Sequence, residues 1–161
     1  MLNIRPATPA DDQALWAMLG PVFHAGDTYA VPTDITRDQA LDYWLRGSHT
    51  AFVAEEGGQI LGTAYLCPNH KGNADHVCNA GFVTSPDARG KGVAQSLLTH
   101  VLAQARAAGY GAMQFNFVVS TNTGAIRLWQ RNGFQVIGTL PQAFRHPQAG
   151  LVDAHVMYQL L

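Results

Sequence analysis

Apolar residues along the chain recur with two different periods, and the alternation between these periods predicts a mixture of helices and strands. The clearest helix covers 93–108, where apolar side chains fall on one face and Gly109 follows the last turn. The polar stretch 24–36 is expected to be a loop that forms a lid or a substrate wall. Other helices are expected from the cap at Thr8 to the breaker pair Gly20-Pro21, through 40–45, and over 123–130.

Runs rich in β-branched and aromatic residues predict seven strands around these helices. The turn Glu56-Gly57-Gly58 is expected to join two of them as a hairpin. Because strands and helices follow one another in mixed order, the pattern predicts an α/β (α+β) fold, in which helices flank a mixed central sheet. The expected strands cover 2–5, 50–55, 59–66, 76–83, 113–119, 134–140 and 151–160.

Composition narrows the classes of protein that this pattern allows. With 161 residues, 47% of them hydrophobic, the chain is expected to form one domain over 1–161. The formal net charge of −1 argues against nucleic acid as a partner. No run of about 18 apolar residues occurs, so no membrane segment is expected and the expected location is cytoplasmic. Two cysteines, Cys67 and Cys78, are too few to staple such a domain and are expected to be reduced.

A glycine-containing loop, Arg89-Gly90-Lys91-Gly92, connects the strand at 76–83 to the clearest helix. This arrangement gathers unpaired backbone N–H groups and the positive end of a helix dipole, which favours an anion such as a pyrophosphate. The alternative is a tight turn whose basic side chains face water. A Walker loop is excluded because no Gly-Lys-Ser/Thr follows, and a dinucleotide fingerprint because its third glycine is missing.

The stretch 81–98 resembles the coenzyme A signature of the GCN5-related N-acetyltransferase (GNAT) family. A second landmark of that family, at 122–134, follows at the expected distance. The resemblance extends over essentially the whole chain and implies a GNAT-like single domain, whose mostly antiparallel sheet is splayed in the middle. It also implies acetyl-CoA as the co-substrate and no metal.

The resemblance assigns the cofactor to the gap between the strands at Phe82 and Phe117, where pantetheine would pair with the backbone of Phe82 and Val83. Asn122 and Trp129 are expected beside the pantetheine arm. The pyrophosphate is expected to meet the backbone N–H groups of Arg89, Gly90, Lys91, Gly92, Val93 and Ala94.

Acetyl transfer requires a neutral amine, yet an amine of pKa about 10 is neutral in roughly one molecule per thousand at pH 7. Its proton must pass to a side chain or to water, and the oxyanion must meet a backbone N–H, which the resemblance assigns to Phe82 or Val83. Much of the family carries a tyrosine as general acid at the position of Trp129. Since tryptophan does not readily give up a proton, the thiolate is expected to leave unaided.

The strands on both sides of the gap carry Asn79 and Asn116, and Asn122 follows. Asparagine is unfavourable inside strands, which favours a catalytic or acceptor-binding role for Asn79 and Asn116 over the alternative that they satisfy strand ends. Asp75 and His76 lie where many relatives carry a glutamate or histidine base. Water is the other candidate for taking the proton.

The acceptor is expected to be a small amine with an adjacent carboxylate, bound by Tyr29, Asn79 and Asn116. The asparagine pattern resembles the GNAT enzymes that acetylate proline analogues, and Gly26–Tyr29 resembles the substrate loop of phosphinothricin acetyltransferases. Arg145 is the candidate partner for the carboxylate, on a loop expected at 144–146. That loop alternatively faces solvent or contacts a second copy in a homodimer.

Three other interpretations stay open. The spacing of Cys67 and His70 relative to His76 and Cys78 can close a tetrahedral zinc site, although these side chains also suit ordinary strand positions. A protein or peptide N-acetyltransferase would need an open groove in place of a small pocket. A non-catalytic coenzyme A binding sensor is the third, because the usual tyrosine is missing.

Overall fold

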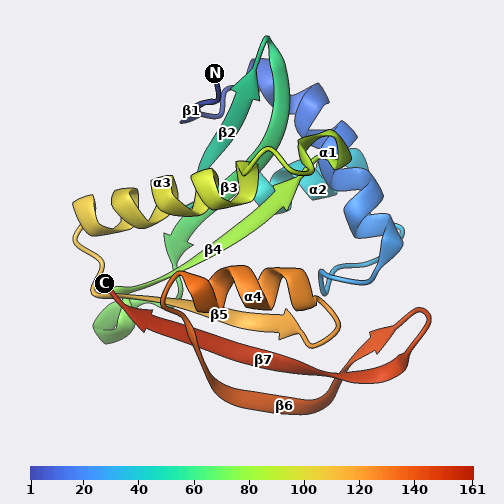
Figure 1. Cartoon of the computed structure of the whole chain (residues 1–161), viewed down its shortest axis with the longest axis vertical. Coiled ribbons are helices and arrows are strands. Elements are labelled where there is room, and N and C mark those ends of the chain that lie inside the picture. The colour runs from blue at the N-terminus through green and yellow to red at the C-terminus, as the bar shows by residue number, and fades with distance from the viewer.

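A computed structural model covers residues 1–161 and contains one seven-stranded sheet with the strand order β1-β2-β3-β4-β5-β7-β6 (Figure 1). The strands are β1 (Asn3–Pro6), β2 (Thr50–Glu56), β3 (Gln59–Pro68), β4 (Val77–Thr84), β5 (Ala112–Val119), β6 (Gln135–His146) and β7 (Gly150–Leu160). The helices are α1 (Asp12–Ala25), α2 (Arg37–Leu45), α3 (Val93–Ala107) and α4 (Thr123–Arg131). Three single 3-10 turns cover Pro9–Asp11, Gly72–Ala74 and Pro86–Ala88.

Neighbouring strands pair antiparallel everywhere except between β4 and β5. That parallel pairing is confined to Val77 opposite Ala112 and Cys78 opposite Met113, after which the two strands diverge (Figure 1). The predicted fold class and the predicted splay are therefore confirmed. The divergence leaves one edge of β4 open inside the molecule, which is where a strand-like ligand can pair with backbone groups.

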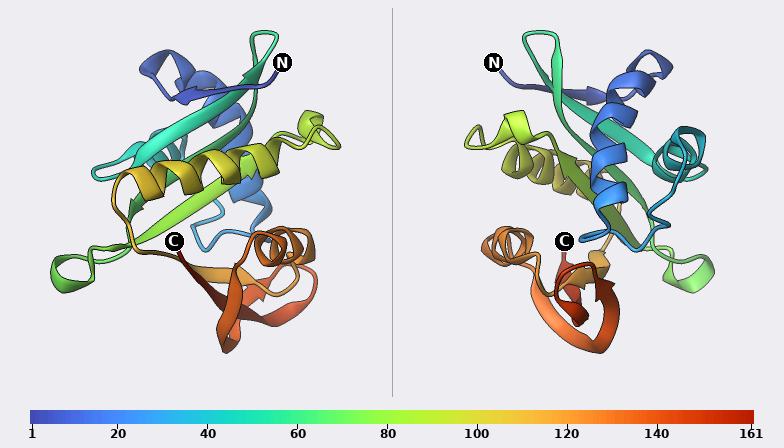
Figure 2. Two further views of the ribbon diagram at one scale, coloured as in Figure 1. Left: turned by 60° about the vertical axis from the view of Figure 1, so that its left-hand side comes forward. Right: turned by 90° about the vertical axis from the view of Figure 1, so that its right-hand side faces the viewer.

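The sheet is covered on both faces, with α3 and α4 on one side and α1 and α2 on the other (Figure 2). Successive side chains of β2 serve the two faces, as the pleat requires: Phe52 and Ala54 join the core under α3, and Val53 joins the core under α1. A Cβ at Gly62 of β3 would lie 2.8 Å from both Val93 and Leu97, so glycine permits this close approach of α3.

Helix α1 extends past Gly20-Pro21, so the prediction that this pair ends the helix is wrong, as is the loop expected at His24 and Ala25. A proline inside a helix costs about 3 kcal/mol, because it removes one hydrogen bond and crowds the preceding turn. Burial of a phenylalanine side chain offsets this by about 1.5–3 kcal/mol, and Phe23 is fully buried. Gly20, which has no Cβ, also relieves the restriction on a residue before proline. The helix ends at Ala25 and is capped by Gly26, whose φ is 66°.

Strand β6 is longer than predicted, because Phe144, Arg145 and His146 continue it and pair with Val152, Leu151 and Gly150. The expected loop at these positions is therefore wrong. The sequence signal for a strand end is real, since the register shifts between Leu140 and Phe144. Pairing resumes after this irregularity, where the buried Phe144 packs on Phe117 with ring centroids 6.0 Å apart. None of the helices combines the length and the apolar character that crossing a membrane requires.

Candidate active site

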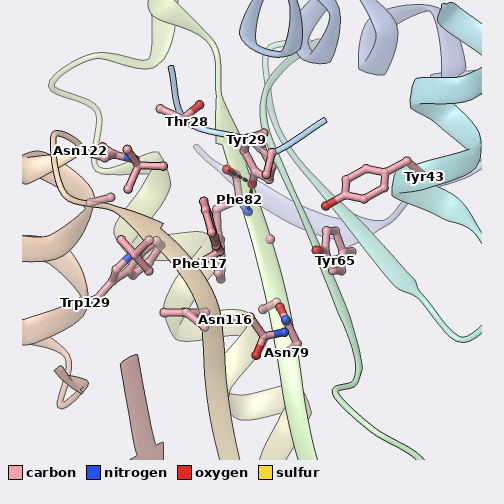
Figure 3. Close-up of a pocket in the computed structure, with 17 residues that line it drawn as sticks. Thr28, Tyr29, Tyr43, Tyr65, Asn79, Phe82, Asn116, Phe117, Asn122 and Trp129 are labelled. Carbon is pink, nitrogen blue, oxygen red and sulfur yellow. Dashed lines mark hydrogen bonds between the residues drawn. The ribbon is translucent and has the colours of Figure 1, made fainter. Parts of the chain in front are cut away.

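A cavity of about 260 Å³ lies where β4 and β5 diverge (Figure 3). Its walls come from β4, β5, α4 and the loop between α1 and α2, and Tyr43 and Tyr65 also line it. None of the lining residues carries a carboxylate, ammonium, guanidinium or imidazole group. The cavity therefore offers a bound molecule only amides, hydroxyls, aromatic rings and backbone groups.

Residues of β4 direct their backbone groups alternately toward β3 and toward the gap. Ser85, just after β4, donates its N–H to β3 at 2.9 Å, whereas both backbone groups of Phe82 bond to a side chain on the gap side. This alternation directs the backbone of Ala80 and Phe82 toward the gap and that of Val83 toward β3. The expectation that the Val83 backbone meets the pantetheine or the oxyanion is thereby corrected, whereas Phe82, the other residue expected there, has both backbone groups on the gap side.

The Tyr29 hydroxyl occupies the gap-side backbone of Phe82. It donates to the Phe82 carbonyl oxygen at 2.9 Å and accepts from the Phe82 N–H at 3.1 Å (Figure 3). The ring packs on Phe23 and Trp44, with centroids 5.3 and 6.0 Å apart. A ligand can pair with these backbone groups only after the hydroxyl withdraws, so the position of Tyr29 is coupled to the occupation of the gap.

Asn79 and Asn116 face one another across the gap, as expected for residues on its two walls (Figure 3). Both donate their side-chain N–H groups to one oxygen, Oδ1 of Asn69, at 3.3 and 2.7 Å. Asn122 also lines the cavity, at the start of α4. Asn69 was missed by the sequence reasoning, because it lies in the turn after β3 and carries no motif of its own.

Trp129 forms an aromatic wall of the cavity together with Phe82 and Phe115. Its ring centroid lies 5.1 Å from that of Phe82 and 4.8 Å from that of Phe115, and the side chain is buried. The indole thus shapes the cavity by packing, and it offers no titratable group there.

Three tyrosines line the cavity, of which only Tyr29 was expected from the sequence. Burial is the largest cause that raises the pKa of Tyr29, Tyr43 and Tyr65 above the ordinary value. All three hydroxyls therefore keep their protons at neutral pH and cannot act as ionised bases. Nothing in the spacing of Tyr43 and Tyr65 along the chain indicates that α2 and β3 bring them to the same pocket.

A second hollow, a groove of about 530 Å³, lies over the glycine loop and the start of α3. The N–H groups of Arg89 and Lys91 bond to carbonyl groups inside the loop. In the loop and the first turn of α3, five backbone N–H groups make no hydrogen bond within the chain, and two of them belong to glycines with φ of 77° and 70°, Gly90 and Gly92. The other three belong to Val93, Ala94 and Gln95. This is the donor array that a pyrophosphate requires, without the N–H groups of Arg89 and Lys91 that the sequence interpretation included.

The basic side chains near this groove differ in their surroundings. Arg89 and Arg131 both line it, and Arg131 was not among the residues expected from the sequence. Lys91 lies 3.7 Å from Glu56 of the β2–β3 hairpin. Because α4 contributes to both hollows, an elongated molecule can extend from the groove into the cavity along the open edge of β4.

Several residues predicted for the acceptor or the proton lie outside the cavity. Arg145 is on β6 and does not line the cavity. Asp75 and His76 precede β4, have exposed side chains and do not line the cavity either. Cys67 and Cys78 are free thiols in the core, and burial raises their pKa values to about 11 and about 12. No group of three or more His, Cys, Asp or Glu side chains gathers to hold a metal ion.

Sequence comparison connects this geometry with known proteins. The sequence model of the "Acetyltransferase (GNAT) family" matches residues 15–134. The chain is 32% identical to N-acetyltransferase aca1 of Schizosaccharomyces pombe over 81% of this chain and 71% of that protein. It is 30% identical to the L-methionine sulfoximine/L-methionine sulfone acetyltransferase of Pseudomonas aeruginosa over 87% of this chain and 84% of that protein.

Solved structures show the same architecture. A GCN5-related N-acetyltransferase from Kribbella flavida superposes with a TM-score of 0.95 at 41% identity, covering 99% of this chain and 98% of that one. Two more distant chains of this fold, 21% and 22% identical, were solved with acetyl-CoA bound.

Proposed function

Since the chain belongs to the GNAT family of acetyltransferases, we propose that its single domain, residues 1–161, acetylates the amine of a small amino-acid-like or imino-acid-like acceptor at the gap between β4 and β5. Membership of this family implies that the acetyl donor is acetyl-CoA and that the acetyl group is transferred to an amine. The observation that carries the finer proposal is the small cavity without charged side chains, lined by the amides of Asn79 and Asn116. A relative that acts on methionine sulfoximine supports this acceptor class.

The cofactor is proposed to lie along the open edge of β4. Its pyrophosphate would accept hydrogen bonds from the free N–H groups of Gly90, Gly92, Val93 and Ala94 at the start of α3. Its pantetheine arm would pair with Phe82 in place of the Tyr29 hydroxyl and would pass between Asn122 and the indole of Trp129.

The chemical step follows from the groups around the cavity. The neutral amine nitrogen attacks the thioester carbonyl carbon, and the developing oxyanion would accept a hydrogen bond from the gap-side N–H of Ala80. The C–S bond then breaks, and coenzyme A leaves as a thiolate. The amine's proton passes to water, since no ionised side chain lines the cavity.

The absence of a cation from the cavity wall changes how an acceptor carboxylate would be held. Arg145 is not proposed for this role, because it lies on the β6–β7 hairpin and does not line the cavity. The available donors include the unpartnered hydroxyl of Thr28, the hydroxyls of Tyr43 and Tyr65 and the amide of Asn122, which bind a carboxylate as neutral hydrogen-bond donors.

A panel of acceptors tests the proposed substrate class. Azetidine-2-carboxylate, proline, phosphinothricin, methionine sulfoximine, a lysine-containing peptide and kanamycin are compared by thiol release from acetyl-CoA. One of the first four is expected to give the highest kcat/KM, because a peptide needs an open groove and a polycation needs carboxylates. A preference of about tenfold or more, equal to about 1.4 kcal/mol, for the peptide or kanamycin would remove the small-acceptor proposal while leaving acetyl transfer intact.

The pH dependence of the reaction tests the role of water as proton acceptor. The pKa values of Tyr29, Tyr43 and Tyr65 are raised, so none of these groups titrates near neutrality. We expect kcat/KM to rise with pH until the acceptor amine itself is neutral, at a pKa of about 10 for an ordinary amine. The variant His76→Gln is the control and is expected to give the same profile. An additional limb at lower pH that disappears in this variant would identify His76 as the base.

A further inference from the structure

One side-chain oxygen connects the two strands that diverge at the cavity. Oδ1 of Asn69 accepts from Nδ2 of Asn79 on β4 at 3.3 Å and from Nδ2 of Asn116 on β5 at 2.7 Å. Beyond Cys78 and Met113 no backbone ladder joins these strands. The hydrogen bonds to Asn69 are therefore a bridge between the two walls just past the point where the sheet opens.

Asn69 is itself fixed behind the cavity. Its backbone N–H donates to the Val77 carbonyl oxygen at 2.8 Å, which holds the turn after β3 against the start of β4. Asn69 does not line the cavity. Its own Nδ2 is buried and makes no hydrogen bond, a costly state that accompanies the orientation in which Oδ1 faces the other two amides.

The bridge determines which end of the Asn79 amide is free. An amide has a donor end and an acceptor end, and these exchange places when the group rotates by half a turn. With Nδ2 of Asn79 held by Asn69, the Oδ1 atom of Asn79 is the end that remains free of protein donors. Asn116 is held at both ends, since its Oδ1 accepts from Nε2 of Gln114 at 2.8 Å.

We propose, building on the proposed function, that Asn69 is a positioning residue that keeps the carbonyl oxygen of Asn79 available to the N–H of the acceptor amine. An amine about to attack must point its lone pair at the thioester and its N–H groups at hydrogen-bond acceptors. No carboxylate lines the cavity, and the free Oδ1 atom of Asn79 is an acceptor that the wall can supply. Asn69 touches neither substrate and acts through Asn79 and Asn116.

Kinetics of four single variants and one double variant test this role, with the acceptor that the wild type uses best. Asn69→Ala is expected to lower kcat/KM for the acceptor about tenfold, with KM for acetyl-CoA unchanged within about twofold. Asn69→Asp, which keeps an oxygen facing both amides, is expected to stay within about threefold of the wild type. Asn73→Ala, an exposed asparagine of the same turn, is the matched control and is expected to match the wild type.

The double variant separates positioning from general structure. If Asn69 acts through Asn79, then adding Asn69→Ala to Asn79→Ala should lower kcat/KM by less than about threefold more. Fully additive losses, or a loss in Asn69→Asp as large as in Asn69→Ala, would overturn the proposal.

A measurement that needs no acceptor keeps the test independent of the proposed function. In ¹⁵N-resolved NMR spectra of the free protein, Asn69→Ala is expected to shift the side-chain NH₂ signals of both Asn79 and Asn116, whereas Asn73→Ala should leave them unchanged. Unshifted signals would refute the bridge. If no acceptor on the panel is turned over by the wild type, the proposed function fails, and the NMR result still decides whether Asn69 holds the two amides.

Discussion

Replacing Gly92 by aspartate is expected to weaken acetyl-CoA binding by about a hundredfold or more, whereas Gly92→Asn is expected to weaken it by less than about tenfold. Gly92 has a φ of 70°, a conformation that both asparagine and aspartate tolerate better than other side chains. A Cβ at this position meets no atom within 4 Å, so the fold accommodates either residue. The two variants differ in charge alone, and a carboxylate there would lie against the proposed pyrophosphate.

The expected magnitude follows from Coulomb's law. Two like charges 4 Å apart near a protein surface repel by about 4 kcal/mol, and a hundredfold change in affinity corresponds to about 2.7 kcal/mol. Calorimetric titration with acetyl-CoA gives the two dissociation constants, and thermal unfolding checks that both variants are folded. Equal affinities for Gly92→Asp and Gly92→Asn would show that the pyrophosphate does not lie at the start of α3.

The second large effect concerns the acceptor side of the cavity. Asn79→Ala is expected to lower kcat/KM about a hundredfold, because it removes the amide oxygen proposed to hold the amine in the geometry of attack. Trp129→Phe is expected to lower kcat/KM by less than about tenfold, because phenylalanine retains much of the packing on Phe82 and Phe115. Steady-state kinetics with the preferred acceptor measure both values.

The order of these two effects is the informative result. A hundredfold loss in Trp129→Phe together with a small loss in Asn79→Ala would invert the assignment, giving the indole a role in the chemical step. The KM for acetyl-CoA is the internal control, since Asn79→Ala should leave it unchanged within about twofold, whereas Trp129→Phe perturbs a wall that the pantetheine is proposed to touch.

Local sequence patterns were sufficient to predict most of the fold and the position of the glycine loop proposed to bind the cofactor. Helix α3 and the β2–β3 hairpin were both predicted, because each depends on residues that are close together in the sequence. The helix follows from its apolar periodicity and the hairpin from its turn residues. The loop at Gly90 and Gly92 could also be recognised, since glycine there is required by the positive φ angles. The sequence could not show which backbone N–H groups of this loop are free to bind an anion, because the hydrogen bonds inside the loop depend on its three-dimensional path.

The errors arose where tertiary packing outweighs a local signal. Pro21 is a helix breaker by itself, yet burial of Phe23 carries α1 past it. The strand was predicted to end at Leu140, where the register shifts, and this prediction misplaced Arg145 on a loop. The backbone direction of Val83 depends on its pairing with β3, and a shift of one residue reverses that direction.

The residues of the proposed acceptor site were predictable only in part, because they meet through the fold. Asn79 and Asn116, which line the cavity, were singled out from their unusual place inside strands. Tyr43 and Tyr65 suit ordinary core positions in the sequence, and Asn69 suits an ordinary turn. The divergence of β4 from β5 opens the cavity that Tyr43 and Tyr65 line, with Asn69 behind it.

A crystal structure of the protein with acetyl-CoA would show directly where the cofactor binds. We expect pyrophosphate oxygens at about 2.7–3.2 Å from the backbone nitrogens of Gly90, Gly92 and Val93, with the pantetheine paired to Phe82. We also expect that the Tyr29 hydroxyl has left the Phe82 backbone, with the acetyl group in the cavity beside Asn79. Cofactor bound away from the start of α3, or a Tyr29 hydroxyl still bonded to Phe82 while the pantetheine lies outside the gap, would contradict the proposed binding mode.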